Sequence, residues 1–487
     1  MLLALALAAA QPDIVVRTTA GAIAGEALPD GRRLFRGVPF AQPPIGPLRW
    51  KPPLPPKPWR GVRDATRSGP GCIQIDYGWN HGNALRQSED CLYLDVATPR
   101  LAPARKLPVM VWIHGGGNRA GGGAGTIQSD LGKQIVLVSI QYRLGAFGFL
   151  SHPALTAESR HRSSGNYALL DQQAALRWVR ANIARFGGDP ANVTIFGESA
   201  GGQDVGLQML SPLGRGLFHK AIAESGTAGF GLPPRGLRAN EAIGEAVVRA
   251  AGAPAHADAA ALRRLPAGAL LQAAEKADVP GLADKSFIWL QAVHDGWVLR
   301  EPPARTLARD GGAPVPLLIG TNARELSAFD STVRPQAAIG RAFGAQAAAA
   351  RRFYNGVPNP DPRRGDLGLQ VSTDFIFACP AGVVAAAHAR AGHPTWQYEF
   401  DYALPGSDVS HSSEIKFVMQ APTSFPVGAP PLHLYWLNFA RTGDPNGAGL
   451  PRWQPYAPGA RYISFQNGKA EMRSNLRGAV CRLRDLP

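Results

Sequence analysis

The stretch Val193-Thr194-Ile195-Phe196-Gly197-Glu198-Ser199-Ala200-Gly201 decides how this sequence folds. Its first four residues suit a buried strand, and residues 205–210 that follow are compatible with a helix. Gly-x-Ser-x-Gly between a strand and a helix forms a tight turn, because the glycines let the backbone bend and leave the serine hydroxyl exposed. The stretch therefore predicts Ser199 as a nucleophile at the carboxyl end of a strand.

The serine motif by itself is a weak signal in this chain. Glycine occupies 56 of the 487 positions, and roughly 0.3 matches to Gly-x-Ser-x-Gly arise by chance. A plain glycine turn is the alternative interpretation. The strand before the motif and the helix after it favour the nucleophile turn.

Short apolar runs without polar alternation indicate the fold class, because they are typical of parallel strands covered on both faces. They lie at residues 107–113, 135–140, 193–196 and 315–319. Apolar residues recur at helical spacing over residues 166–185 and stop at Gly187-Gly188. This alternation predicts an α/β fold with a mostly parallel central sheet and helices on both faces.

A glycine-rich loop directly follows the run at 107–113. His114-Gly115-Gly116-Gly117 offers main-chain amides to a carbonyl oxygen that becomes an anion, and such amides are fixed and already oriented. A flexible turn is the alternative, since Gly121-Gly122-Gly123 makes this region glycine-rich in any case. The loop together with the serine turn favours an oxyanion site.

A serine nucleophile needs a base, usually histidine, oriented by a carboxylate, and in α/β hydrolases the chain order is Ser, acid, His. His411 lies alone in a small polar loop beyond a strand-like segment at 396–402, whereas the other late histidines suit a structural role. These others are His388, His393 and His433. His411 is the candidate base, with a structural role as the open alternative.

The carboxylate is expected just past a strand end. Glu325 follows the run at 315–319 and the turn Gly320-Thr321-Asn322. Asp295 and Asp330 are the competing candidates.

Composition narrows the classes of function. The chain is 45% hydrophobic and 18% charged, which is typical of a globular protein. Its formal charge of +15 is spread over scattered basic pairs such as Arg351-Arg352, and no run resembles a nucleic-acid arm. No nucleic-acid partner is expected.

The chain begins with an apolar segment. Residues 1–10 are almost all Leu and Ala and end in Ala8-Ala9-Ala10, which predicts a secretory signal although no basic region precedes it. Residues 11–487 are expected to form a single domain. No other run of 18 apolar residues is evident, so no membrane span is expected.

Cysteine usage points to disulfides. Cys72, Cys91, Cys379 and Cys481 form neither a CxxC motif nor a Cys/His cluster, so no metal or redox site is expected. An even count behind an export signal favours two disulfides, and three pairings are open.

Ordered motifs elsewhere carry a resemblance that covers nearly the whole chain. They are Phe35-Arg36-Gly37-Val38-Pro39-Phe40-Ala41-Gln42-Pro43-Pro44, Ser88-Glu89-Asp90-Cys91-Leu92-Tyr93-Leu94, Phe186-Gly187-Gly188-Asp189-Pro190 and Trp436-Leu437-Asn438-Phe439-Ala440. With the serine turn they resemble the type-B carboxylesterase and cholinesterase family of α/β hydrolases, which includes bacterial para-nitrobenzyl esterases. The resemblance implies an α/β-hydrolase fold with large inserted helical regions.

The resemblance also implies a function and its residues. The expected function is serine carboxylesterase, acting on a small-molecule ester through a Ser-His-Glu triad and an acyl-enzyme, without metal or cofactor. The implied nucleophile is Ser199, the acid Glu325 within Gly-x-Asn-x-x-Glu, the base His411 within His-x-x-Glu-Ile, and the oxyanion donors the amides of Gly116, Gly117 and Ala200.

Further positions follow from the resemblance. It implies the disulfides Cys72 to Cys91 and Cys379 to Cys481, the first closing a loop over the mouth of the site. Asp76, Tyr77, Trp79 and His81 of that loop are expected at the entrance, although Trp79 is equally compatible with a packing role. The implied substrate pocket contains Trp79, Glu198, Ile288 and Phe329. A secreted or periplasmic location is expected.

The chain departs from the family pattern at two places near the implied triad. Gln203-Asp204 stands where small residues are usual, and Leu326 stands where glycine is common. Two alternative functions stay open: a hydrolase of a special ester such as a lactone, carbamate or natural toxin, and a non-catalytic binding module of the same fold.

Overall fold

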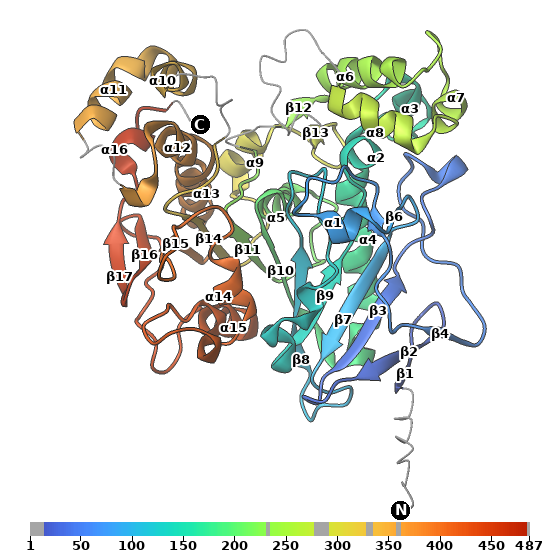
Figure 1. Ribbon diagram of the computed structural model, residues 1–487, viewed down its shortest axis with the longest axis horizontal. Helices are drawn as coiled ribbons and strands as arrows, with labels where there is room; N and C mark the ends of the chain where they lie inside the picture. Colours follow the sequence, from blue (N-terminus) through green and yellow to red (C-terminus); the bar gives the residue numbers. More distant parts are fainter. Residues whose placement is uncertain (1–13, 230–233, 277–291, 328–334, 357–361, 485–487) are drawn as a thin grey trace, which may run out of the picture.

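The computed structural model describes residues 14–229, 234–276, 292–327, 335–356 and 362–484 (Figure 1). The expectations for residues 1–10, Ile288, Phe329 and Asp330 lie outside the described residues.

A mixed β-sheet forms the centre of the described chain, with 13 strands in the order β1-β2-β3-β7-β9-β8-β10-β11-β14-β15-β16-β17 and β4 beside β2. Pairing is parallel from β9 to β16 and antiparallel at both ends. The strands are β1 (Ile14–Arg17), β2 (Ala22–Ala27), β3 (Arg33–Pro39), β4 (Val62–Asp64), β7 (Tyr93–Thr98), β8 (Leu107–Ile113), β9 (Val136–Ile140), β10 (Gly188–Glu198), β11 (Lys220–Glu224), β14 (Leu317–Asn322), β15 (Thr395–Asp401), β16 (Arg461–Gln466) and β17 (Lys469–Ser474).

Two short ladders lie apart from this sheet. They are β5 (Gly71–Cys72) with β6 (Gln87–Ser88), and β12 (Arg235–Gly236) with β13 (Val293–His294). The mostly parallel centre predicted from the apolar runs is confirmed.

Helices surround the sheet, and Figure 1 shows α6, α7 and α8 gathered at the upper right and α10 and α11 at the upper left. The helices are α1 (His81–Ala84), α2 (Gly145–Phe149), α3 (Pro153–Glu158), α4 (Tyr167–Asn182), α5 (Ala200–Leu210), α6 (Leu237–Ala250), α7 (Ala259–Arg263), α8 (Ala267–Lys276), α9 (Pro303–Asp310), α10 (Pro335–Phe343), α11 (Ala347–Gly356), α12 (Leu367–Ser372), α13 (Cys379–Arg390), α14 (Ile415–Met419), α15 (Leu432–Thr442) and α16 (Gly478–Cys481).

The central strands are apolar on both faces because helices cover both faces. On β8, Val109, Val111 and Ile113 belong to one hydrophobic core. Met110 and Trp112, the residues between them, belong to the other. This arrangement explains why the sequence of β8 shows no polar alternation.

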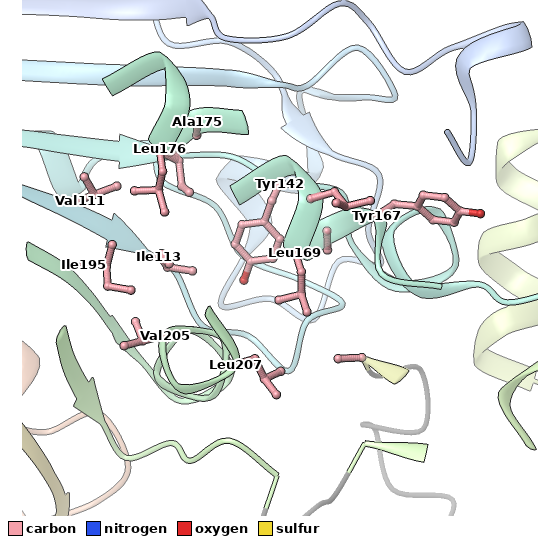
Figure 2. Close-up of a cluster of buried hydrophobic side chains, with 14 of the residues drawn as sticks. Val111, Ile113, Tyr142, Tyr167, Leu169, Ala175, Leu176, Ile195, Val205 and Leu207 are labelled. Atoms are coloured by element: carbon pink, nitrogen blue, oxygen red, sulfur yellow. The ribbon is translucent and has the colours of Figure 1, made fainter. Parts of the chain in front are cut away.

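Helices α4 and α5 pack on the first of these cores (Figure 2). Leu176 of α4 and Val205 of α5 lie with Ile113 of β8 and Ile195 of β10, all fully buried. Burial of one such side chain contributes about 1.5 to 3 kcal/mol to stability. This packing fixes α5, whose first residue directly follows Ser199.

Helix α4 confirms the helix predicted at 166–185. It continues into a 3-10 turn, Ile183–Phe186, and ends at Gly187, whose φ of +83° suits glycine. Several of its polar side chains are buried with the apolar ones, among them Asp171 and Gln172. Asp171 binds the buried Arg143 with an N–O distance of 2.7 Å.

One continuous helical stretch, residues 367–390, is long and apolar enough to cross a membrane. Of its apolar window, 67% is buried inside the protein, where α13 packs on β14 and β15. This stretch was not identified from the sequence as long and apolar. Its burial shows that it is a helix of the protein core. No other helix among the described residues meets the same length and hydropathy criteria.

The structure pairs Cys72 with Cys91 and Cys379 with Cys481, as the resemblance implies. The bridges close loops with sequence separations of 19 and 102 residues. By restricting the unfolded chain, each contributes about 3 to 5 kcal/mol to the free energy of unfolding.

We predict that the oxidised protein contains no titratable thiol. Thiol titration of the unfolded, non-reduced protein checks this, and the variant Cys72→Ser is the positive control because it leaves Cys91 without its partner. A thiol signal from the parent protein would contradict the pairing.

Candidate active site

Ser199 lies in a strained turn between β10 and α5. Its φ of +58° and ψ of −124° place a non-glycine residue in a region that costs about 1 to 3 kcal/mol. Its amide donates to the carbonyl of Glu224 on β11 at 2.9 Å. A Cβ at Gly197 or Gly201 would lie within 2.5 Å of the Ile113 carbonyl oxygen, so the turn requires glycine on both sides.

A cavity of about 660 Å³ opens beside this turn. Segments distant in the sequence meet on its wall, among them the serine turn, the glycine loop and the loop of His411. The lining residues include Tyr77, Trp79, Asn83, Trp112, His114, Gly115, Gly116, Gly117, Arg119, Glu198, Ser199, Leu326, His411 and Ser412.

The glycine loop runs against the serine turn. Gly116 and Gly117 have φ values of +99° and +65°, which side chains rarely adopt. A Cβ on Gly115 would lie 3.0 Å from the Ser199 Cβ. The main chain of this loop therefore approaches the candidate nucleophile as closely as glycine permits.

Trp79 belongs to the cavity wall. Its ring edge lies 2.9 Å from where a Gly116 Cβ would stand, and 65% of the residue is exposed. A core packing role, the open alternative for Trp79, does not agree with this exposure.

His411 and Glu325 form a close pair. His411 Nδ1 lies 2.5 Å from Glu325 Oε2. The other carboxylate oxygen accepts from the Asn322 amide and from the Ser225 hydroxyl, each at 2.7 Å. The Glu325 amide donates to Thr373 Oγ1 at 3.1 Å. The Glu325 side chain and main chain are therefore held by Asn322, Ser225 and Thr373, and its second carboxylate oxygen contacts the imidazole.

The other imidazole nitrogen faces Glu198, the residue before Ser199. His411 Nε2 lies 3.1 Å from Glu198 Oε1, which also accepts from the Ser412 hydroxyl at 2.5 Å. Among the residues that the structure describes, none forms a hydrogen bond with this nitrogen. The Glu198 carboxylate is thus the charged group that faces His411 Nε2, on a side chain that lines the cavity.

The charges around His411 determine its protonation. Burial disfavours the imidazolium, but the carboxylates of Glu198 and Glu325 outweigh burial and raise the pKa of His411 to about 9. Burial in turn raises the pKa of Glu198, against the opposing charge of His411.

Two further buried glutamates lie behind the pair and were not singled out from the sequence. Glu414 accepts from Asn322 Nδ2 at 2.6 Å, and burial raises its pKa to about 8. Glu224 accepts from Trp436 Nε1 at 3.0 Å, and burial raises its pKa well above the usual range. Asn322 is the Asn of the Gly-x-Asn-x-x-Glu motif, and Glu414 is the Glu of the His-x-x-Glu-Ile motif. These motifs were the sequence signal from which both residues could have been identified.

Comparison with known proteins identifies the family. The sequence profile of the Carboxylesterase family matches residues 12–484. The chain belongs to the carboxylesterase family. It is a carboxylic ester hydrolase, 35% identical to rat carboxylesterase 1E over 89% of this chain and 85% of that protein.

A bacterial esterase and a solved structure are also similar to this carboxylesterase. The fumonisin B1 esterase of Sphingopyxis macrogoltabida is 34% identical over 93% of this chain and 86% of its own. The solved structure of a PNB esterase superposes with a TM-score of 0.81 at 31% identity, covering 96% of this chain and 99% of that one. These likenesses confirm the α/β-hydrolase fold.

The competing candidates from the sequence have structural roles in this carboxylesterase. Asp295 Oδ1 accepts from three successive amides, those of residues 297–299. His388 is buried between the carbonyls of Gly311 and Val315. His433 binds the Val418 carbonyl at 2.8 Å. The ring of His393 faces the Asp310 carbonyl at 3.3 Å.

Of the four residues expected at the entrance, two line the cavity and two do not. Tyr77 and Trp79 line the cavity, whereas Asp76 and His81 pair with each other at 2.6 Å and do not line it. Arg119 lies over the Tyr77 ring at 4.5 Å. Within the described ranges, no group of three His, Cys, Asp or Glu side chains could hold a metal ion.

We predict that Glu198→Gln moves the alkaline rise of kcat/KM to lower pH. The rise reports loss of the His411 proton in the free enzyme, and removing the Glu198 charge removes a cause of its raised pKa. A pH–rate profile with a nitrophenyl ester measures the shift. The matched control is Asp76→Asn, which removes an exposed carboxylate from another histidine. A rise that stays in place or moves to higher pH would contradict the role of Glu198.

Proposed function

We propose that this carboxylesterase hydrolyses esters through an acyl-enzyme on Ser199, with His411 as the base and Glu325 as the group that orients it. One observation carries the proposal: His411, held by Glu325 at 2.5 Å through Nδ1, lines the same cavity as Ser199 and the glycine loop. Nucleophile, base and anion-binding amides then surround one space of substrate size.

Acylation begins when His411 Nε2 takes the hydroxyl proton as Ser199 Oγ attacks the ester carbonyl carbon. The carbonyl oxygen becomes an anion and accepts from the amides of Gly116, Gly117 and Ala200. His411 next donates its proton to the ester oxygen, the bond to that oxygen breaks, and the alcohol leaves. The acyl group stays on Ser199.

Deacylation repeats these steps with water. His411 takes a proton from water as its oxygen attacks the acyl carbon, and the same amides hold the second oxyanion. The proton then returns to Ser199 Oγ as the carboxylic acid is released. Glu325 stabilises the imidazolium in both halves and holds the reacting tautomer.

A special ester is the second candidate substrate. The fumonisin B1 esterase relative acts, by its name, on a natural toxin, and its match covers 93% of this chain and 86% of its own. A cavity of about 660 Å³ has room for an ester-bearing natural product. Hydrolysis assays that compare simple nitrophenyl esters with such compounds distinguish the two candidates.

We also propose that the enzyme works outside the cytoplasm, in the extracellular space or periplasm. The support is the pair of disulfides, since such bridges persist in oxidising compartments.

We predict that Ser199→Ala lowers kcat/KM for a short nitrophenyl ester by at least about a thousandfold, because the covalent route is lost. An organophosphonate probe is expected to label the parent protein and not this variant. The exposed Ser407→Ala is the matched control and keeps both properties. Parental activity in Ser199→Ala would overturn the proposed mechanism, and an inactive, unlabelled parent would favour the binding-module alternative.

A further inference from the structure

Asp204 is a buried carboxylate that the mechanism above does not use. It lies on α5, five residues after Ser199, and is fully buried. Its Oδ1 accepts from Asn118 Nδ2 at 3.1 Å, and its Oδ2 accepts from Gln172 Nε2 on α4 at 2.6 Å. The first of these bonds leads from the nucleophile helix to the glycine loop.

Asn118 directly follows Gly117 and fixes the path of the glycine loop. It is 1% exposed, and its φ of +59° continues the left-handed conformations of Gly116 and Gly117. Its main-chain carbonyl accepts from the Gly145 amide at 2.7 Å. Asparagine tolerates this conformation better than most residues. The loop thus turns on a buried residue whose side chain is held by Asp204.

We propose that Asp204 is a positioning residue that, through Asn118, sets the amides of Gly116 and Gly117 in register with Ser199. The inference rests on the proposed function, in which those amides bind the oxyanion. Ser199 directly precedes α5, the helix that carries Asp204, and Asn118 is adjacent to the donor loop. A single side-chain hydrogen bond therefore links the nucleophile with its anion-binding donors.

A carboxylate suits this position because both of its oxygens face donors. Gln172 Oε1 accepts from Gln208 Nε2 at 2.9 Å, so Gln172 presents its nitrogen to Asp204. Asn118 also presents its nitrogen to Asp204, while its Oδ1 lies 3.3 Å from the Tyr142 hydroxyl, which donates to the His114 carbonyl at 2.5 Å. Burial raises the pKa of Asp204 to about 7, and the two amides oppose this shift. The small residue usual in the family would leave both donors without an acceptor.

The test is a double-mutant cycle on the full chain with Asp204→Ser and Asn118→Gly. Glycine keeps the left-handed backbone at residue 118 and removes only the side chain. We expect each variant to lower kcat for a nitrophenyl ester about tenfold with little change in KM, because the lost interaction acts in the transition state. Affinity for a trifluoromethyl ketone, which forms an oxyanion on Ser199, should fall by a similar factor. The kcat of the double variant should be no lower than that of the less active single variant, because both substitutions break the same hydrogen bond.

Asn240→Ala is the matched control. Asn240 on α6 is a buried amide like Asn118, and its Nδ2 donates to Ser151 Oγ at 2.9 Å and to the Phe149 carbonyl at 3.2 Å, outside the network of Asp204. It should lower the Tm and leave kcat within about twofold.

The outcomes separate positioning from packing. If Asp204→Ser lowers the Tm as Asn240→Ala does but keeps kcat and ketone affinity, Asp204 only packs the helix and the inference is wrong. Asn118→Gly tests the same link if Asp204→Ser does not fold, since it leaves the α4 and α5 contacts in place. Activity retained by Ser199→Ala overturns the proposed function, whereas normal kcat in both cycle variants beside an inactive Ser199→Ala overturns only the inference.

Discussion

The left-handed backbone at Ser199 is the constraint on which the rest of the site depends. It exists only because β8 and β10 run side by side, with Gly197 and Gly201 against the Ile113 carbonyl. Of the nine non-glycine residues with positive φ in the described chain, Ser199 and Ser412 line the cavity, Asn118 follows Gly117, and Ser225 donates to Glu325. Backbone strain is concentrated where the chemistry takes place, and the two-sided hydrophobic core sustains it.

Electrostatics at the site follow from the same packing. The packing brings Glu198, Glu325 and Glu414 near a single imidazole, and all three are buried. Glu325 accepts from amide and hydroxyl donors beside His411, whereas burial raises the pKa values of Glu224 and Glu414. The result is a histidine whose cation is favoured before any substrate binds.

Local sequence patterns predicted the parallel strands and helix α4. The apolar runs located the parallel strands, and helical spacing located α4, because each element is buried on more than one side. The antiparallel ends of the sheet and the core helix at 367–390 were missed, since their burial depends on partners far along the chain. For the same reason Ser225 and Glu414, 189 residues apart yet in contact, could not be paired from the sequence. Glu325 and His411 became candidates through their positions after strand-like segments, and the family motifs then implied their roles.

The entrance differs from the interior in what it can tolerate. Trp79 is 65% exposed on a loop that Cys72 and Cys91 tether at its base, so a substitution there changes stability by only a few tenths of a kcal/mol in typical cases. The serine turn and the carboxylates behind His411 have no such freedom. In evolutionary terms, a lineage carrying this fold can change the esters it accepts by altering its rim, while the reaction itself is inherited unchanged.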